Sequence, residues 1–264
     1  MSTPRSRVAC EPQLRVLFLP RDLATPNAVC VVLDVLRASS TLVTLLAGGA
    51  APVYVAATVE AARALAASLT PRPLLCGEVG GLPPPGFDAG NSPRELAALS
   101  LDARPVVLAT SNGTRALVAL SAAPRVLVGC FLNATATARR AWAEACTLGV
   151  DLALVCAGDD GGTRFALEDA LAAGCLLDRL LADGTAAVSR LDDAALAAWR
   201  LWRSYAADDA TTAAARGMAD SAHGRELAAL GFGADVDSCA RLDALALVPV
   251  LTSEAGRLVL RSAR

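Results

Sequence analysis

Aromatic side chains and histidines are scarce in this sequence. Aromatic residues make up 4% of its 264 residues, and His223 is the single histidine. Hydrophobic residues nevertheless make up 54% of the chain, so we expect an aliphatic core large enough for a folded domain. The single histidine excludes a metal centre built from several histidines.

The sequence also lacks excess positive charge and long apolar runs, which excludes two classes of partner. The formal net charge is −2, so no basic surface is expected to bind a nucleic-acid backbone. The N-terminus lacks the basic and apolar pattern of a signal peptide, and no apolar run reaches the roughly 18 residues of a membrane span. We therefore expect a cytoplasmic protein that binds neither nucleic acid nor membranes.

No pair of the eight cysteines has the C-x-x-C spacing of a zinc or redox site. Most of them lie inside apolar runs such as LLCGE (74–78) and ALVCAG (153–158). Buried, reduced thiols are the expected state, with disulfides or a zinc site as the alternatives.

Short apolar segments alternate with helical patterns along the first two thirds of the chain. Such alternation is typical of a mainly parallel sheet covered by helices on both faces. The patterns predict strands at 14–19, 28–35, 52–57, 73–78, 105–110, 125–130 and 151–158, and helices at 40–48, 58–69, 93–100, 114–121, 134–147 and 167–182.

After residue 185 helical patterns dominate until two late strands at 245–251 and 257–261. The expected fold class is therefore α/β, a three-layer α/β/α arrangement with a mainly parallel or mixed sheet and a more helical C-terminal part. We expect one domain over 1–264, with two lobes at about 1–150 and 151–264 as the alternative.

The connection at 77–96 is rich in glycine and proline and far longer than usual in an α/β unit. It ends in Ser92, Pro93 and Glu95, the pattern of a capped helix start. A connection of this length is usually functional or disordered, and this one has an ordered end.

Polar residues follow five of the predicted strands at the point where each strand ends. In open parallel sheets ligands bind beyond the carboxyl ends of the strands, so we expect these residues to share one site. Carboxylates, amides, hydroxyls and arginines suit a phosphate and a hard divalent cation. The residues are Asp34, Arg37, Ser39, Ser40, Thr41, Glu78, Asn91, Ser92, Thr110, Asn112, Gly113, Thr114, Arg115, Asn133, Asp159, Asp160, Glu168 and Asp169.

Several of these residues also have purely structural interpretations. Ser39, Ser40 and Thr41 are typical helix caps, and the TSNGTR segment at 110–115 is either a turn or an anion site. A carboxylate that closes a buried strand, as Asp34 does, needs a cation or an arginine beside it.

The acids near the predicted helix 167–182 and the histidine are ambiguous in the same way. Glu168 and Asp169 follow the helix start, where the helix dipole favours acids whatever their function. Asp159 and Asp160 lie in a glycine-rich loop typical of solvated turns, and His223 resembles a helix-start residue.

Read together, these motifs resemble the 2-phosphosulfolactate phosphatase family. They follow the family order and span almost the whole chain, except for the first twelve residues and the region at 185–215. The motifs are VVLDVLRASST (31–41), CGEVGG (76–81), GFDAGNSP (86–93), LATSNGTRAL (108–117), GCFLNATA (129–136), VCAG (155–158), LEDALAAG (167–174) and HGRELAALGFGADVDSCARLDALALVPVL (223–251).

The resemblance implies an enzyme of the phosphoric monoester hydrolase class that uses Mg²⁺ and was first linked to coenzyme M biosynthesis. Its substrate would be a phosphorylated 2-hydroxy acid, (R)-2-phospho-3-sulfolactate, which would give 3-sulfolactate and phosphate. The alternatives are a phosphatase of another phosphorylated carboxylic acid and a non-catalytic binding module for a phosphorylated metabolite. A small anionic substrate is the expected partner. The apolar composition is compatible with a homodimer, but the sequence does not determine the oligomeric state.

The residues divide into three expected roles. Asp34, Glu78, Glu168 and Asp169 are the candidate ligands of Mg²⁺. Asp34, Arg37, Glu78 and Asn112 are the candidate catalytic residues, and Arg37, Arg115 and Arg164 are candidates for a second anion pocket. The candidate phosphate-binding residues are Ser39, Ser40, Thr41, Asn91, Ser92, Thr110, Gly113, Thr114, Arg115 and Asn133.

Two mechanisms are compatible with these residues. Either a carboxylate activates a water molecule, or Asp34 attacks phosphorus and forms an aspartyl-phosphate. The segment DVLRAS at 34–39 lacks the D-x-D-x-T pattern, which favours direct attack by water.

Overall fold

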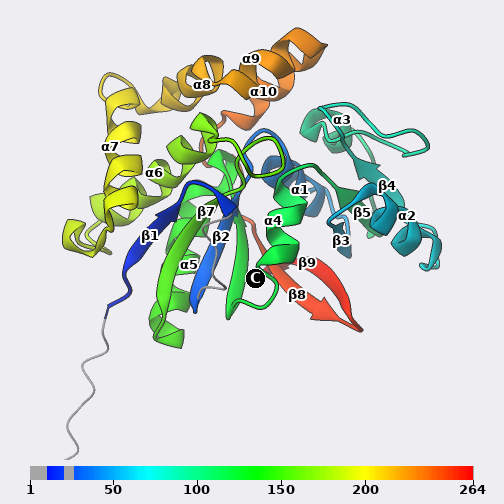
Figure 1. Ribbon diagram of the computed structural model, residues 1–264, viewed down its shortest axis with the longest axis horizontal. Helices are drawn as coiled ribbons and strands as arrows, with labels where there is room; N and C mark the ends of the chain where they lie inside the picture. Colours follow the sequence, from blue (N-terminus) through cyan, green and yellow to red (C-terminus); the bar gives the residue numbers. More distant parts are fainter. Residues whose placement is uncertain (1–10, 21–26, 264) are drawn as a thin grey trace, which may run out of the picture.

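The computed structural model describes residues 11–20 and 27–263, which form one sheet of nine strands covered by helices (Figure 1). The strand order is β1-β7-β2-β6-β8-β9-β3-β5-β4. The strands are β1 (Leu14–Leu17), β2 (Ala28–Leu33), β3 (Val53–Ala56), β4 (Leu74–Gly77), β5 (Val106–Ala109), β6 (Arg125–Gly129), β7 (Asp151–Cys156), β8 (Val248–Glu254) and β9 (Arg257–Ala263). All nine expected strands are present, with ends shifted by a few residues.

The six expected helices between these strands are also present. They are α1 (Ala38–Ala47), α2 (Val59–Ala67), α3 (Pro93–Ala97), α4 (Gly113–Ala119), α5 (Ala134–Leu148) and α6 (Leu167–Ala182). Helices α5 and α6 pack together and against β2 and β7, whereas α1 and α4 pack together and against β2, β3 and β6. The three-layer α/β/α prediction is confirmed.

The sheet consists of two parallel groups separated by an antiparallel hairpin. Strands β1, β7, β2 and β6 are parallel, as are β3, β5 and β4, and the β8–β9 hairpin pairs antiparallel with β6 on one side and β3 on the other. The two groups therefore run in opposite directions along the sheet. The hairpin also places the last strands of the chain in the middle of the sheet, next to strands from the first half.

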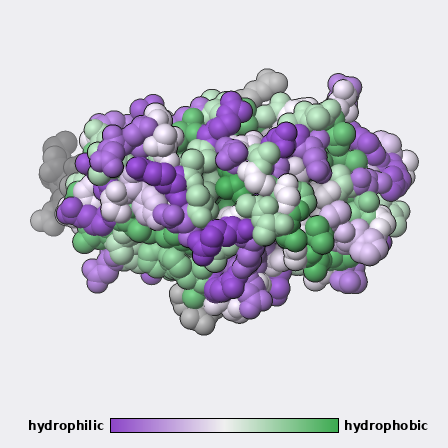
Figure 2. Space-filling view, turned by 90° about the horizontal axis from the view of Figure 1, so that it is seen from above, coloured by the Kyte–Doolittle hydropathy of each residue, from purple (hydrophilic) through white to green (hydrophobic). Residues whose placement is uncertain are grey.

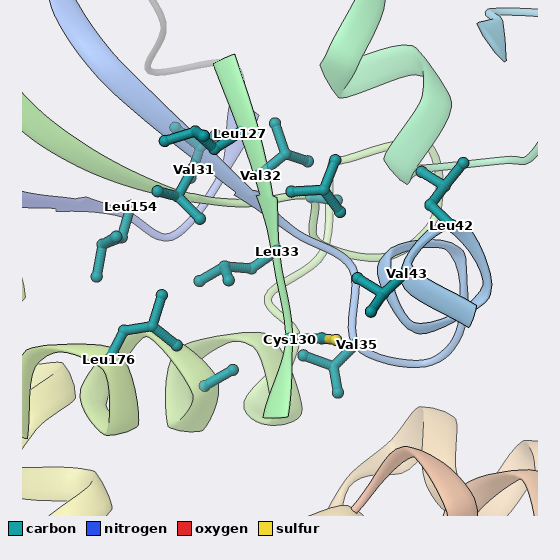
Figure 3. Packing of buried hydrophobic residues seen from close by; sticks show 14 of the residues in the cluster. Val31, Val32, Leu33, Val35, Leu42, Val43, Leu127, Cys130, Leu154 and Leu176 are labelled. Carbon is teal, nitrogen blue, oxygen red and sulfur yellow. The ribbon is translucent and has the colours of Figure 1, made fainter. Parts of the chain in front are cut away.

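The strands are continuous apolar runs because both faces of the sheet are covered. Every residue of β2 is buried. Figure 3 shows Val31 and Leu33 of β2 among Leu127 of β6, Leu154 of β7 and Leu176 of α6. Such aliphatic packing stabilises the strand whose end opens the functional site.

The C-terminal part is helical before its two strands, as expected. It contains α7 (Asp193–Tyr205), α8 (Ala210–Asp220), α9 (Ala222–Leu227), a π-helical turn (Ala228–Phe232) and α10 (Gly233–Cys239). Helix α10 contacts α3, so this segment reaches from the α6–α8 side of the molecule across to the connection that follows β4 (Figure 1). It carries residues to the site from a distant part of the sequence.

The cysteines are mostly buried thiols, in agreement with the sequence. Those buried and free are Cys30, Cys76, Cys130, Cys156, Cys175 and Cys239. Burial raises the pKa of Cys30, Cys76 and Cys175 to about 12, which keeps these thiols protonated. Cys146 is free but exposed, and Cys10 lies outside the described residues.

The surface carries polar and apolar residues in a mixed pattern. Figure 2 shows hydrophilic and hydrophobic side chains interspersed over the face seen from above. None of the helices in residues 11–20 and 27–263 combines the length and the apolar character that crossing a membrane would need.

Candidate active site

A pocket of about 350 Å³ lies where the ends of four strands meet helix α9. Its walls come from the segments that follow β2, β4, β5 and β7, together with the α9 region. The two parallel groups of the sheet therefore meet at this pocket despite their opposite directions. The lining residues that carry polar side chains are Asp34, Arg37, Glu78, Asn91, Ser111, Asn112, Asp159, Asp160, Arg164, His223 and Glu226.

Asp34 is a buried carboxylate directly after β2. Its Oδ1 accepts a hydrogen bond from the backbone N–H of Ala38 at 3.3 Å, and the N–H of Gly113 is a second donor to the carboxylate. A Cβ on residue 113 would lie 2.6 Å from Oδ2, so only glycine allows this approach. Burial raises the pKa of Asp34 to about 6, against a lowering effect of His223 and a further raising effect of Glu78.

Glu78 follows β4 and joins two loops of the pocket. Its Oε1 accepts a hydrogen bond from the N–H of Ser111 at 2.7 Å, and its Oε2 accepts one from the N–H of Gly81 at 2.9 Å. The Ser111 hydroxyl donates a longer one at 3.4 Å. The carboxylate thus has a fixed orientation beside the pocket and is half-buried.

Arg37 lines the pocket, but its guanidinium is already paired. Nη1 donates to Asp235 at 3.0 Å, Nη2 donates to the carbonyl of Gly81 at 2.7 Å, and the guanidinium lies 4.3 Å from the ring centre of Phe232. Asp235 also accepts a hydrogen bond from the Ser92 hydroxyl at 2.7 Å. Through these contacts Arg37 connects the loop after β4 with α10. Because a buried ion pair of this kind is costly to break, the connection is a stable one.

Two asparagines of the pocket differ in their partners. Oδ1 of Asn91 is buried and has no hydrogen-bond partner among the described residues, while its backbone carbonyl accepts the hydroxyl of Thr41. Oδ1 of Asn112 accepts a hydrogen bond from the N–H of Gly161 at 2.8 Å. Since a buried amide oxygen without a donor is unfavourable, Asn91 has an acceptor free for a ligand.

A second charged cluster also lines the pocket. Arg164 pairs with Asp159 and, at 3.4 Å, with Glu226. Nδ1 of His223 lies 4.0 Å from Asp159 and 3.8 Å from Glu226, is buried, and has no hydrogen-bond partner among the described residues. Burial would raise the pKa of Asp159, but hydrogen bonds from Arg164 and from the Asp160 N–H outweigh this effect and lower it.

The acids at the start of α6 lie outside this pocket. Asp169 accepts hydrogen bonds from the N–H groups of Val35 at 2.9 Å and Gly158 at 3.2 Å, so it links the segments that follow β2 and β7. Burial, together with the charges of Glu168 and Asp34, raises its pKa well above the ordinary value. Glu168 lines a separate pocket of about 160 Å³ that shares Asp159, Arg164 and His223 with the main one.

Most of the predicted hydroxyl ligands make local or structural hydrogen bonds instead of lining the main pocket. Ser39 accepts a hydrogen bond from the N–H of Asp34, and Ser40 and Thr41 donate to the carbonyls of Val35 and Asn91. Thr110 and Thr114 exchange hydrogen bonds with each other. Their binding of phosphate stays a prediction.

Three further predicted residues lie beside or away from the main pocket. Asn133 is fully buried and bonded to the backbone of Cys130, Val128 and Leu247. Ser92 caps α3 and bonds to Asp235. Arg115 lines a neighbouring pocket.

Comparison with known proteins shows to which family the chain belongs. The family model described as 2-phosphosulpholactate phosphatase matches residues 17–254. The chain belongs to the 2-phosphosulfolactate phosphatase family. This membership confirms the expected class of enzyme, a phosphoric monoester hydrolase.

Several curated relatives in the 2-phosphosulfolactate phosphatase family carry the name "Probable 2-phosphosulfolactate phosphatase". The protein from Deinococcus radiodurans is 43% identical over 240 residues, covering 90% of this chain and 93% of the relative. The protein from Carboxydothermus hydrogenoformans is 37% identical over 254 residues, covering 96% and 98%. The protein from Thermus thermophilus is 37% identical over 250 residues, covering 94% and 98%. The range matched by the family model contains every segment that lines the pocket.

The pocket of this 2-phosphosulfolactate phosphatase family member has donors that fit Mg²⁺. Magnesium binds one or two carboxylates and keeps several waters. Asp34 and Glu78 are carboxylates on the pocket wall, and Asn91 has an amide oxygen without a donor. The described residues also contain a group with ligand atoms within 4.8 Å of one another, formed by Asp159, His223 and Glu226. Arg164 already pairs with both acids of that group, so Asp34 and Asn91 fit the cation better.

The buried carboxyl of Asp34 predicts a pH-dependent stability in metal-free buffer. Its pKa lies near 3.8 ordinarily and is raised to about 6 in the folded protein, so the folded state loses stability as pH rises from 4 past 6. This loss is about 3 kcal/mol at most. We expect Asp34→Asn to gain Tm relative to the wild type between pH 4 and pH 7, measured by thermal unfolding with EDTA.

The matched control is Asp237→Asn, which changes an exposed acid on α10. Its Tm difference from the wild type should be the same at both pH values. A Tm difference for Asp34→Asn that does not grow with pH contradicts the burial effect on Asp34.

Proposed function

We propose that this protein is a magnesium-dependent phosphatase that hydrolyses (R)-2-phospho-3-sulfolactate to 3-sulfolactate and phosphate. Membership in the family supports the reaction class and the substrate named for the relatives. The observation that carries the magnesium part is the buried Asp34 carboxylate, which has a raised pKa and no ion pair among the described residues. It lines the same pocket as Asn91, whose side-chain oxygen has no donor in that part of the chain. Location in the cytoplasm, a place in coenzyme M biosynthesis and a homodimer stay predictions.

Asp34 and Asn91 would hold the cation, with waters completing its coordination. Bound Mg²⁺ would neutralise charge on a nonbridging oxygen of the phosphate, which lowers the barrier of phosphoryl transfer. The N–H groups of Ala38 and Gly113 orient the Asp34 carboxylate before any ligand arrives. Such preorganisation is the main contribution that a protein makes to this reaction.

In our proposal, the Glu78 carboxylate orients and deprotonates the attacking water. Hydrogen bonds from Gly81 and Ser111 fix its two oxygens at the pocket wall. The water oxygen bonds to phosphorus as one of its protons passes to Glu78. The bond from phosphorus to the hydroxy-acid oxygen breaks, and that oxygen takes up a proton from solvent. Asn112 joins the segment after β5 to the loop after β7, because its Oδ1 accepts a hydrogen bond from the N–H of Gly161.

A phosphate-release assay tests the proposed function. The panel of substrates contains 2-phosphosulfolactate, 2-phospholactate and other phosphorylated 2-hydroxy acids. We expect phosphate release from 2-phosphosulfolactate with Mg²⁺ and none with EDTA. Asp34→Asn should lower kcat/KM by about 10²- to 10⁴-fold, because it removes a ligand of the cation, whereas the exposed control Asp237→Asn should retain the wild-type value. Binding of these esters without magnesium-dependent release from any of them would instead identify a binding module.

Direct attack by water predicts that no phosphate is bonded to the protein during turnover. Wild-type protein quenched in acid during turnover of ³²P-labelled substrate should carry no label after denaturation. Label that is retained by the wild type and lost in Asp34→Asn would show an aspartyl-phosphate and overturn the water mechanism.

A further inference from the structure

Three arginines lie near the active-site pocket, and two of them already have carboxylate partners. Arg37 is paired with Asp235, and Arg164 with Asp159 and Glu226. These two guanidinium groups would have to break existing ion pairs to bind an anionic substrate. Neither is suited to recognise a second acid group of the substrate.

Arg115 differs from both of them. It lies on α4, is exposed, and makes no ion pair or side-chain hydrogen bond within the part of the chain that the structure describes. It lines a second pocket of about 560 Å³, together with hydroxyl residues Thr58, Thr110 and Ser111. A free guanidinium beside hydroxyl groups is suited to an anionic oxygen of a ligand.

The second pocket adjoins the active-site pocket. Four residues line both of them, namely Glu78, Ser111, Asp160 and Gly161. Nη1 of Arg115 lies 3.1 Å from the position that a Cβ of Gly161 would take, and Gly161 has a φ of +67°. Glycine at this position therefore lets the guanidinium approach the wall that the two pockets share.

Two carboxylates of the shared wall face this second pocket and must be considered with Arg115. Glu78 accepts hydrogen bonds from the N–H groups of Ser111 and Gly81, which offset part of its charge. Asp160 receives a hydrogen bond from the hydroxyl of Thr163 at 3.4 Å. Neither carboxylate is in an ion pair with Arg115 within the described residues, so the positive charge of the arginine remains available to a ligand.

We propose that this second pocket binds the sulfonate group of the substrate and that Arg115 is the residue that recognises it. This inference rests on the proposed function, because the substrate class named for the relatives carries a phosphate, a sulfonate and a carboxylate. With the phosphate at Asp34 and Asn91, the sulfonate extends over the wall at Ser111 and Gly161 toward Arg115. Arg115 then determines substrate specificity and is not part of the phosphate site.

Steady-state kinetics on two substrates that differ only in the sulfonate test this assignment. We expect Arg115→Gln to lower kcat/KM for 2-phosphosulfolactate about 10- to 100-fold more than for 2-phospholactate, mainly through KM, since a hydrogen bond to a charged group is worth about 1.5–3 kcal/mol. Arg115→Lys should recover part of this difference. Arg241→Gln, which removes an exposed arginine from α10's C-terminal side, is the control for loss of one positive charge.

An equal loss of kcat/KM on both substrates would place Arg115 at the phosphate and overturn the proposal. An unchanged kcat/KM on both substrates would also overturn it. Calorimetric binding of 3-sulfolactate and lactate to the same variants separates this result from a failure of the proposed function. If the wild type releases no phosphate from any ester, a selective weakening of 3-sulfolactate binding in Arg115→Gln still supports the sulfonate pocket. Equal weakening of both acids, or no weakening, overturns it.

Discussion

The burial of one carboxylate, that of Asp34, constrains the rest of the active site. The charge lies at the end of a strand that is buried along its whole length, and two backbone N–H groups are the hydrogen-bond donors to it. Such burial favours the protonated form unless a cation is bound nearby. Gly113 is required beside it, since a Cβ there would collide with the carboxylate. The glycine at residue 113 thus follows from the position of this carboxylate.

The acids and arginines around Asp34 divide into those that build the site and those that face a ligand. Asp169 bonds to backbone N–H groups after β2 and β7, and Arg37 bonds to Asp235 on α10. Both interactions join segments that are distant in sequence and meet at the pocket. Glu78 and Asn91 line the pocket, and the side-chain oxygen of Asn91 has no donor among the described residues, which leaves the chemistry to a small number of groups.

The sequence predicted the elements well because their patterns are local. Strands and helices follow from apolar periodicity, and the placement of Asp34 and Glu78 at strand ends follows from the strands themselves. The partner of Arg37 could not be predicted, because Asp235 is 198 residues away in sequence. His223 was recognised only as a helix-start residue, since its position beside Asp159 depends on how α9 packs. The insertion of β8 and β9 between the parallel groups is likewise a long-range property, without a signal in either strand.

Contacts that depend on the folded structure also explain why the roles of the serine and threonine residues could not be predicted. The sequence showed three hydroxyls at the start of α1, a pattern common to caps and to phosphate sites. In the folded protein Ser40 and Thr41 donate to the carbonyls of Val35 and Asn91. The Thr41 bond fixes the backbone of Asn91, whose side chain has the free oxygen. A residue with a structural role therefore orients one with a proposed ligand role.

Titration of the protein with Mg²⁺ by calorimetry, without substrate, tests the central claim most directly. Because burial raises the pKa of Asp34 to about 6, binding to the wild type near pH 6 should release protons, seen as a dependence of the heat on the buffer. Asp34→Asn should lose both the binding and the proton release. Undiminished Mg²⁺ binding by Asp34→Asn, or binding by the wild type without proton release, would contradict the role assigned to this buried carboxylate.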